Sequence, residues 1–257
     1  MNQNPVKGKN PNRPVLLDKP LPYCPGCGHG IINRLLSEAI SELGIREKSI
    51  GVVGIGCYTI MHKYLKMDTF CALHGRAVAV STGIKRSRPE NVVFTYQGDG
   101  DCAAIGMGEL VHAAGRGENI TVIMVNNGVY GMTGGQMSPT TLMGQKTSTT
   151  PLGREPRNGA PLHVPEILSA IDCTGYVARV AVNTPRNVRK AKKSIIQAFQ
   201  TQIHEKGFSF VEIVSQCPTH LRLPPVEAVD WVEDQMISEY RLRVFKTAKG
   251  DKWKKGL

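Results

Sequence analysis

Two short polar motifs, each directly after an apolar run, carry side chains suited to bind a metal ion. QGDGD (97–101) follows NVVFTY, and NNGV (126–129) follows ITVIMV. Asp99 offers a carboxylate, Asn127 offers an amide carbonyl oxygen, and a turn in the second motif can direct the main-chain carbonyl of Val129 to the same point. Mg²⁺ prefers oxygen ligands of this kind, together with phosphate oxygens. The motifs therefore predict a magnesium site with these three ligands.

The glycines of the first motif also suit a phosphate group. A helix is expected to begin directly after the strand, and the free N–H groups at a helix N-terminus attract anions. Gly98 and Gly100 allow the backbone to approach oxygen atoms closely. Asp99 would repel a phosphate unless a divalent cation lay between them. Both motifs together indicate a phosphorylated ligand held through a metal ion, and the alternative is two ordinary strand-to-helix turns.

The cysteines form a second group with chemical potential. CPGC (24–27) precedes an expected helix, and Cys57 and Cys217 each follow an apolar run. Alone, CPGC is compatible with half a zinc site, a redox dithiol or two packed cysteines. A zinc site lacks a second CxxC, and no strand precedes the pair as in a thioredoxin-type dithiol. Four cysteines at one edge of a sheet suit a [4Fe–4S] cluster. The others, Cys71, Cys102 and Cys173, are expected to be free or buried.

Apolar runs and helical segments alternate along the chain and would position both groups. The expected strands cover 50–55, 91–96, 120–125, 176–182 and 208–214, and the expected helices cover 30–43, 75–86, 102–115 and 184–205. Short apolar strands alternating with helices predict a doubly wound, mostly parallel α/β sheet. Ligands bind at the carboxyl ends of such strands, where both polar motifs lie. Residues 134–165 show no periodicity and are expected to be functional or contact-forming, with disorder as the alternative.

Charge and composition divide the chain into three regions. The formal net charge is +11. Residues 1–19 are expected to form an N-terminal arm, residues 20–225 the α/β domain, and residues 226–257 a basic extension. The basic residues of the extension are Arg241, Arg243, Lys246, Lys249, Lys252, Lys254 and Lys255. Without a recognised nucleic-acid motif, we expect no nucleic-acid partner. No run approaches a membrane span and no secretory signal opens the chain, so a cytoplasmic protein is expected.

GDG followed by NN is similar to the signature of thiamine-diphosphate enzymes. With the cysteines, the chain resembles the β subunit of 2-oxoacid:ferredoxin oxidoreductases, through CPGCGHG, GIGC, HGRAVAVSTGIK, VVFTYQGDGD, NNGVYGMTGGQMSPTT and SQCPTH. The resemblance implies the thiamine-diphosphate-binding fold, and it makes Cys24, Cys27, Cys57 and Cys217 the ligands of a [4Fe–4S] cluster. Cys57 and His74 would be catalytic residues. The cofactor would contact Gly56, Cys57, His74, Gly75, Gly98, Asp99, Gly100, Asp101, Asn127, Val129 and Gly131.

The same resemblance implies a reaction and its partners. A 2-oxoacid would be oxidatively decarboxylated with coenzyme A to an acyl-CoA and CO₂, and ferredoxin would collect the electrons. An alpha subunit would complete the thiamine site, beside gamma and ferredoxin-like delta subunits or their equivalents. Branched-chain oxoacids such as 2-oxoisovalerate fit best, and 2-oxoglutarate or pyruvate are alternatives. Rival functions are a non-oxidative thiamine decarboxylase or synthase subunit and a zinc-binding, nucleic-acid-associated module.

Overall fold

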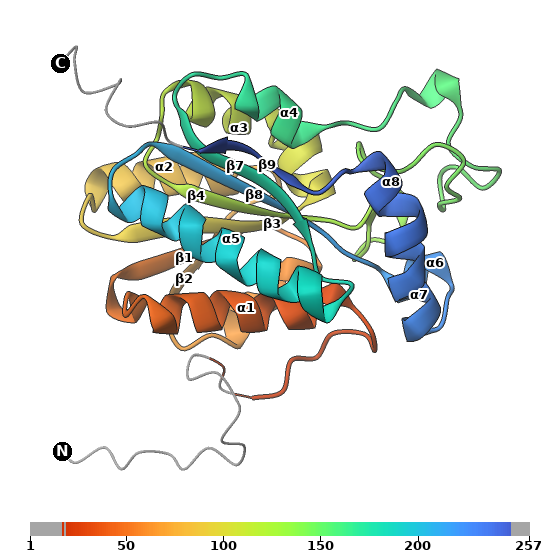
Figure 1. Ribbon diagram of the computed structural model, residues 1–257, viewed down its shortest axis with the longest axis horizontal. Helices are drawn as coiled ribbons and strands as arrows, with labels where there is room; N and C mark the ends of the chain where they lie inside the picture. Colours follow the sequence, from red (N-terminus) through yellow and green to blue (C-terminus); the bar gives the residue numbers. More distant parts are fainter. Residues whose placement is uncertain (1–16, 18, 248–257) are drawn as a thin grey trace.

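A seven-stranded sheet with the order β2-β1-β3-β4-β8-β7-β9 forms the centre of the protein (Figure 1). This computed structural model describes residue 17 and residues 19–247. The first six strands of that order are parallel, and β9 pairs antiparallel with β7. Their bounds are β1 Ser49–Val53, β2 Asp68–Cys71, β3 Val92–Gly98, β4 Thr121–Asn126, β7 Thr174–Ala181, β8 Phe208–Val214 and β9 Arg243–Thr247. The predicted mostly parallel α/β sheet is confirmed.

Helices cover both faces of the sheet. The long helices α1 (Gly28–Glu42) and α5 (Pro185–Ile203) pack side by side on one face (Figure 1). The other face carries α2 (Ala77–Ser87), α3 (Met107–Gly115) and α4 (Val164–Ser169). At the start of α5, the Thr184 hydroxyl caps the helix by accepting a hydrogen bond from the backbone N–H of Asn187. Both layers bury the apolar strands, as continuous burial of β4 illustrates.

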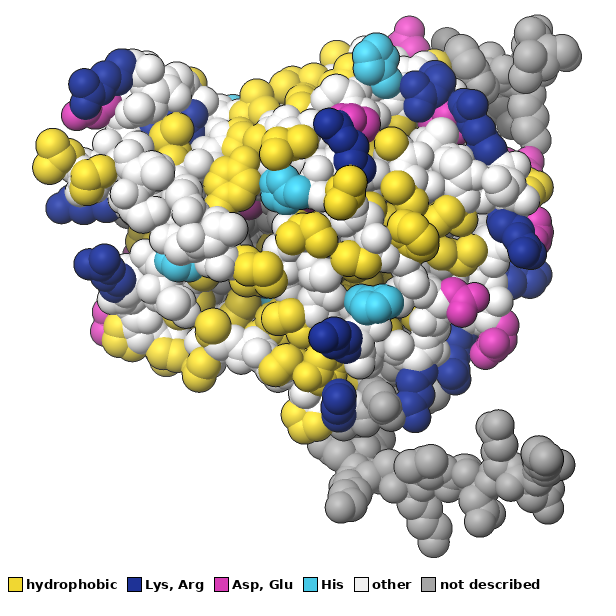
Figure 2. All heavy atoms as spheres, turned by 180° about the vertical axis from the view of Figure 1, so that it is seen from behind, with side chains coloured by type: hydrophobic (Ala, Val, Ile, Leu, Met, Phe, Trp, Pro, Cys, Tyr) yellow, Lys and Arg dark blue, Asp and Glu magenta, His cyan; other side chains and the backbone are white. Residues whose placement is uncertain are grey.

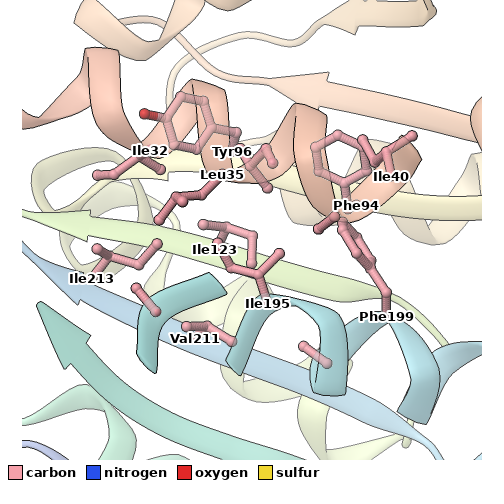
Figure 3. Close-up of a cluster of buried hydrophobic side chains, with 14 of the residues drawn as sticks. Ile32, Leu35, Ile40, Phe94, Tyr96, Ile123, Ile195, Phe199, Val211 and Ile213 are labelled. Carbon is pink, nitrogen blue, oxygen red and sulfur yellow. The ribbon is translucent and has the colours of Figure 1, made fainter. Parts of the chain in front are cut away.

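The core between the sheet and the α1–α5 layer holds β3 and β4 in place (Figure 3). Phe94 of β3 meets Phe199 of α5 edge to face, with 5.4 Å between ring centroids, and both rings are fully buried. Burying a side chain of this size contributes about 1.5–3 kcal/mol. The end of β3 is therefore fixed where the first polar motif begins.

Shorter elements connect the layers. They are η1 Arg46–Lys48, η2 Cys57–Lys63, η3 Asp101–Ile105, β5 Val129–Tyr130, β6 Gln136–Met137, η4 Pro156–Asn158, α6 Pro218–Leu221, α7 Pro225–Trp231, η5 Val232–Met236 and α8 Ile237–Glu239. The helix expected over 102–115 is divided, because η3 is a π-helix that ends at Ile105 and Gly106 separates it from α3. Within the part of the chain that the structure describes, no helix is long and apolar enough to cross a membrane.

The predicted basic extension is joined to the sheet as far as it is described. Residues 225–239 form α7, η5 and α8, and β9 then becomes an edge strand beside β7. A boundary at residue 225 therefore does not coincide with an edge of the folded unit. Lys249, Lys252, Lys254 and Lys255 lie outside the described residues, as do all residues of the expected N-terminal arm except 17 and 19.

Residues 134–165 are folded, although they contain little regular structure. Arg154 is 5% exposed, and its guanidinium donates hydrogen bonds to main-chain carbonyls that include those of Pro139 and Thr141. The segment projects beyond the carboxyl edge of the sheet (Figure 1). The structure therefore supports the expectation that this loop forms contacts and argues against disorder.

Candidate functional site

A cavity of about 340 Å³ lies where the carboxyl ends of β1, β3 and β4 meet. All of the predicted cofactor-binding residues except Gly75 line it: Gly56, Cys57, His74, Gly98, Asp99, Gly100, Asp101, Asn127, Val129 and Gly131. Six further lining residues were not predicted from the sequence, and they are His29, Ile55, Tyr58, Tyr130, Met132 and Thr133. Viewed from behind, the body carries many apolar side chains beside the projecting 134–165 loop (Figure 2).

The register of the sheet brings the two polar motifs together. Gly98, the last residue of β3, pairs with Val125 of β4. Asp99 and Asn126 are the next residues on these neighbouring strands, so that Asp99 and Asn127 reach the same cavity. The predicted meeting of the two strand ends is therefore found in the structure.

Asp99 is a buried carboxylate without a cationic partner among the residues that the structure describes. It is 1% exposed, and its Oδ2 accepts hydrogen bonds from the hydroxyls of Ser138 (2.6 Å) and Thr140. Burial raises the pKa of Asp99 to about 6, while the two hydroxyls lower it. No Lys, Arg or His among the described residues forms an ion pair with it. A buried charge needs compensation, and a divalent cation in the cavity would provide it.

The second motif forms a tight turn that presents two oxygen donors. Gly128 has a φ of +70°, which a glycine adopts without strain. The Asn127 side-chain oxygen accepts a hydrogen bond of 3.3 Å from the backbone N–H of Val129. Thr141 fixes the turn by donating from its hydroxyl to the carbonyl of Gly128, at 2.6 Å. The donor set of carboxylate, amide oxygen and carbonyl, around a buried negative charge, fits Mg²⁺.

Asp101 organises the wall of the cavity opposite this turn. Its Oδ2 accepts a hydrogen bond from Gln97 (2.6 Å), and its Oδ1 accepts one from the backbone N–H of Gly75 (2.5 Å). His74 Nδ1 lies 3.0 Å from the same Oδ1 and 2.9 Å from the carbonyl oxygen of Ile55. With two acceptors beside it, Nδ1 carries the proton, which leaves Nε2 as the unprotonated nitrogen of neutral His74. Asp101 thus orients the predicted catalytic histidine.

Two tyrosines explain the glycines of the first motif. A Cβ on Gly98 would lie 2.8 Å from the Tyr58 ring, and a Cβ on Gly100 would overlap the Tyr130 ring. The hydroxyls of these rings donate to the carbonyls of Ile55 (2.6 Å) and Gly100 (3.1 Å). Glycine at both positions therefore leaves room for the rings, and the predicted close approach to phosphate oxygens stays a prediction.

The four predicted cluster cysteines converge beside the cavity. The Sγ atoms of Cys57 and Cys217 lie 3.5 and 3.9 Å from the point that a Cβ on Gly131 would occupy. Cys24 is close enough to raise the pKa of Cys27, Cys57 and Cys217, and the Cys57 and Cys217 thiols also raise the pKa of Cys27. Burial is the larger cause, and it raises the pKa of Cys27 to about 12 and that of Cys217 to about 11. Each thiol is free, with Cys24 exposed and the other three partly buried.

The spacing of these thiols bears on which metal group they fit. Over the described residues, no three His, Cys, Asp or Glu side chains are close enough to share one metal ion. A [4Fe–4S] cluster is larger than a single metal ion and is held by four thiolates. Cys71, Cys102 and Cys173 are also free cysteines, and Cys102 is buried.

Residues 54–213 match the family model of the thiamine pyrophosphate enzyme, C-terminal TPP binding domain. The chain is 46% identical to ketoisovalerate oxidoreductase subunit VorA of Methanothermobacter marburgensis, over 87% of this chain and 47% of that protein. It therefore spans about half the length of that relative.

Two further relatives are covered over most of their length. The chain is 39% identical to 2-oxoglutarate synthase subunit KorB of Archaeoglobus fulgidus, over 84% of this chain and 76% of that protein. Among solved structures, a 2-oxoglutarate:ferredoxin oxidoreductase from Magnetococcus marinus, with 2-oxoglutarate, coenzyme A and succinyl-CoA bound, superposes with a TM-score of 0.74. That match has 33% identity and covers 89% of this chain and 75% of that chain.

Proposed function

Because this chain belongs to the thiamine pyrophosphate enzymes, and within them to the β subunits of 2-oxoacid:ferredoxin oxidoreductases, we propose that it binds thiamine diphosphate through Mg²⁺. The observation that carries the proposal is the convergence of Asp99 and Asn127 in one cavity. Asp99, Asn127 and the Val129 carbonyl would hold the cation. Gly56, Gly98, Gly100, Asp101 and Gly131 would surround the cofactor, and Gly75 would act through Asp101, which accepts a hydrogen bond from its N–H.

Thiamine diphosphate, when bound, supplies the carbanion-stabilising chemistry of the reaction. The residues of this chain orient it and govern protons near it. His74 has Nδ1 committed to Asp101 and Ile55, so that its Nε2 is free to accept a hydrogen bond or a proton from substrate. Cys57 lines the same cavity and would be a ligand of the redox group at its wall. These placements support the roles proposed for His74 and Cys57 as catalytic residues.

We further propose that Cys24, Cys27, Cys57 and Cys217 hold a [4Fe–4S] cluster. Such a cluster, when bound, accepts electrons singly, which suits transfer from a thiamine site to ferredoxin. Binding requires thiolates, and the raised pKa values of Cys27, Cys57 and Cys217 mean that cluster assembly must displace their protons. The exposed Cys24 faces solvent, so electrons could leave on that side.

The overall reaction proposed is oxidative decarboxylation of a 2-oxoacid with coenzyme A, giving an acyl-CoA, CO₂ and reduced ferredoxin. An alpha subunit would complete the thiamine site, with gamma and ferredoxin-like delta subunits or their equivalents. The names of the relatives support a multi-subunit enzyme. Exposed apolar side chains near the cavity, which include Ile55 and Met132, support coverage by another chain.

For the substrate we propose a branched-chain 2-oxoacid such as 2-oxoisovalerate. The described residues that line the cavity include no Lys or Arg, which a second carboxylate such as that of 2-oxoglutarate would call for. Relatives named for each substrate exist, so both acids must be compared. A higher kcat/KM for 2-oxoisovalerate than for 2-oxoglutarate in the purified complex is expected, and the reverse order would overturn this choice.

The experiment that tests the proposed function is anaerobic purification of the chain with its bound subunits, followed by iron, sulfide, magnesium and thiamine assays. We expect a brown preparation that contains all four. A colourless, iron-free preparation that still holds thiamine diphosphate would instead support the non-oxidative decarboxylase or synthase subunit. Zinc without iron and without thiamine would contradict both.

A further inference from the structure

A buried tyrosine near the C-terminus of the described chain is connected to the cation site without lining it. We propose that Tyr240 is a positioning residue, which fixes Thr140 and, through Thr140, orients the Asp99 carboxylate for cation binding. This inference rests on the proposed function, because it assigns a supporting residue to the same Mg²⁺ site.

The connection consists of two hydrogen bonds in series. The Tyr240 hydroxyl donates to the main-chain carbonyl of Thr140, with 2.7 Å between the oxygens. The Thr140 hydroxyl in turn donates to Oδ2 of Asp99. Tyr240, Thr140 and Asp99 are each no more than 1% exposed. Since water cannot readily replace a lost partner at such a depth, loss of the tyrosine hydroxyl would leave the Thr140 carbonyl unpaired and free to shift.

The ring of Tyr240 also touches the support of the second motif. Asn126, which precedes the proposed ligand Asn127, donates from Nδ2 to Oε1 of Glu212 at 2.6 Å. The other carboxylate oxygen of Glu212 is 2.6 Å from Nε of Arg179, in a pair without exposed side-chain surface. The Arg179 guanidinium stands 5.1 Å from the centroid of the Tyr240 ring. Both proposed metal-ligand turns therefore depend on groups that meet at Tyr240.

The effect of the Tyr240 hydroxyl on cation binding can be separated from the effect of its ring. The ring packs with Leu142, Val232 and Met236 in a small apolar cluster and contacts His163 at 5.2 Å between centroids. Tyr240→Phe keeps these contacts and the contact with Arg179, and it removes only the hydrogen bond to Thr140. A change in cation binding would therefore report on the position of Thr140 and not on core packing.

A matched control is available on β7. Tyr176 is 4% exposed, and its hydroxyl exchanges a hydrogen bond of 2.8 Å with the Ser194 hydroxyl on α5, away from the cavity. Tyr176→Phe thus deletes a buried tyrosine hydroxyl of the same kind at a place that has no connection to Asp99. Both variants should lose similar thermal stability.

The test measures the Kd of Mg²⁺ by calorimetry at saturating thiamine diphosphate, on the complex in which the chain is purified. We expect roughly a tenfold higher Kd for Tyr240→Phe, as loss of one buried hydrogen bond predicts, and an unchanged Kd for Tyr176→Phe. Thr140→Val removes the second hydrogen bond of the series and should weaken Mg²⁺ binding by a similar factor. Thr140→Ser keeps the hydroxyl and should bind Mg²⁺ as the parent does. Tyr240→Phe should add little to Thr140→Val, because both act through one path.

The measured Kd values distinguish failure of the positioning role of Tyr240 from failure of the proposed function. An unchanged Kd in Tyr240→Phe overturns the positioning role and leaves the proposed function standing, and so does an equal loss in Tyr176→Phe. If Tyr240→Phe does not fold, the Thr140→Val and Thr140→Ser pair decides, and equal Mg²⁺ affinity in both overturns the inference. If the parent complex shows no Mg²⁺-dependent binding of thiamine diphosphate, the proposed function fails and the inference fails with it.

Discussion

Ser138 donates a hydrogen bond from its hydroxyl to the Asp99 carboxylate, although the two residues are 39 positions apart in the chain. The serine belongs to the 134–165 loop, and the aspartate follows the central strand β3. The loop is thus part of the proposed cation site, because it supplies the donors that stabilise the buried carboxylate.

Ser138→Ala should shift the pH dependence of Mg²⁺ binding upward. Asp99 must be ionised to bind the cation, and the Ser138 hydrogen bond lowers the pKa of Asp99, which burial has raised to about 6. Removing a hydrogen bond to a charged group costs about 1.5–3 kcal/mol, so the midpoint should move up by roughly one pH unit or more. Mg²⁺ titrations between pH 5 and 8 measure it. Ser148→Ala, at an exposed serine of the same loop, should leave the midpoint unchanged.

Asp99→Asn should abolish Mg²⁺-dependent binding of thiamine diphosphate and stabilise the metal-free chain. The pKa of Asp99 is raised from 3.8 to about 6 in the folded state, so its contribution favours folding below pH 3.8 and is lost as pH rises through 6. At pH 8 the ionised group costs about 3 kcal/mol. Denaturant unfolding in the presence of a chelator should show a more stable variant at pH 8 and a difference that shrinks toward pH 4.5. A parent as stable as the variant at pH 8 would refute the assigned burial cost.

Cys217→Ser should remove iron while leaving thiamine diphosphate in place. A serine hydroxyl is a poor substitute for a thiolate in a cluster site, whereas the cation site at Asp99 shares no ligand with Cys217. Iron, sulfide and thiamine assays on anaerobically purified complex measure both. Cys71→Ser changes an exposed cysteine at the far strand β2 and should retain the full iron content. Equal iron in the two variants would remove Cys217 from the cluster.

The chain should lose stability in mild acid because of His29. This side chain is 3% exposed, its Nδ1 lies 2.5 Å from the Tyr96 hydroxyl oxygen, and burial lowers its pKa from 6.5 to about 4. Its neutral form is favoured by folding, so the contribution is present above pH 6.5 and is lost as pH falls toward 4, by up to roughly 3 kcal/mol. Unfolding of the parent and of His29→Gln at pH 7.5 and 4.5 measures this.

The difference between the two proteins isolates His29 from Asp99, whose titration has the opposite sign and is common to both. His29→Gln should be less sensitive to acid than the parent. An identical loss of stability on acidification would show that the histidine does not titrate as its burial requires.

Local signals were enough to predict the central strands and the meeting of Asp99 with Asn127. Apolar runs identify buried parallel strands, and residues at their carboxyl ends must share an edge, as the pairing of Gly98 with Val125 bears out. The edge strands β2 and β9 were not predicted from the sequence, because they are largely exposed and polar and no apolar run marks them. The loop hydroxyls of Ser138 and Thr140 carry no periodicity, and only tertiary contacts reveal their role.

The aromatic lining of the site also could not be predicted from the sequence. Tyr58 and Tyr130 fill the space beside Gly98 and Gly100, a relation between residues far apart in sequence. The contact of Gly98 and Gly100 with cofactor stays a prediction, and the room that they leave for the two rings is a further role that the sequence did not reveal. The buried His29 could have been suspected from CPGCGHG, where it lies two residues after Cys27.

The most direct test is a structure of the purified complex with thiamine diphosphate and Mn²⁺ in place of Mg²⁺, with the metal located by its anomalous scattering. The account predicts one peak within coordination distance, roughly 2.0–2.2 Å, of an Asp99 carboxylate oxygen, the Asn127 side-chain oxygen and the Val129 carbonyl. A peak that contacts neither Asp99 nor Asn127, with the cofactor bound elsewhere, would contradict it.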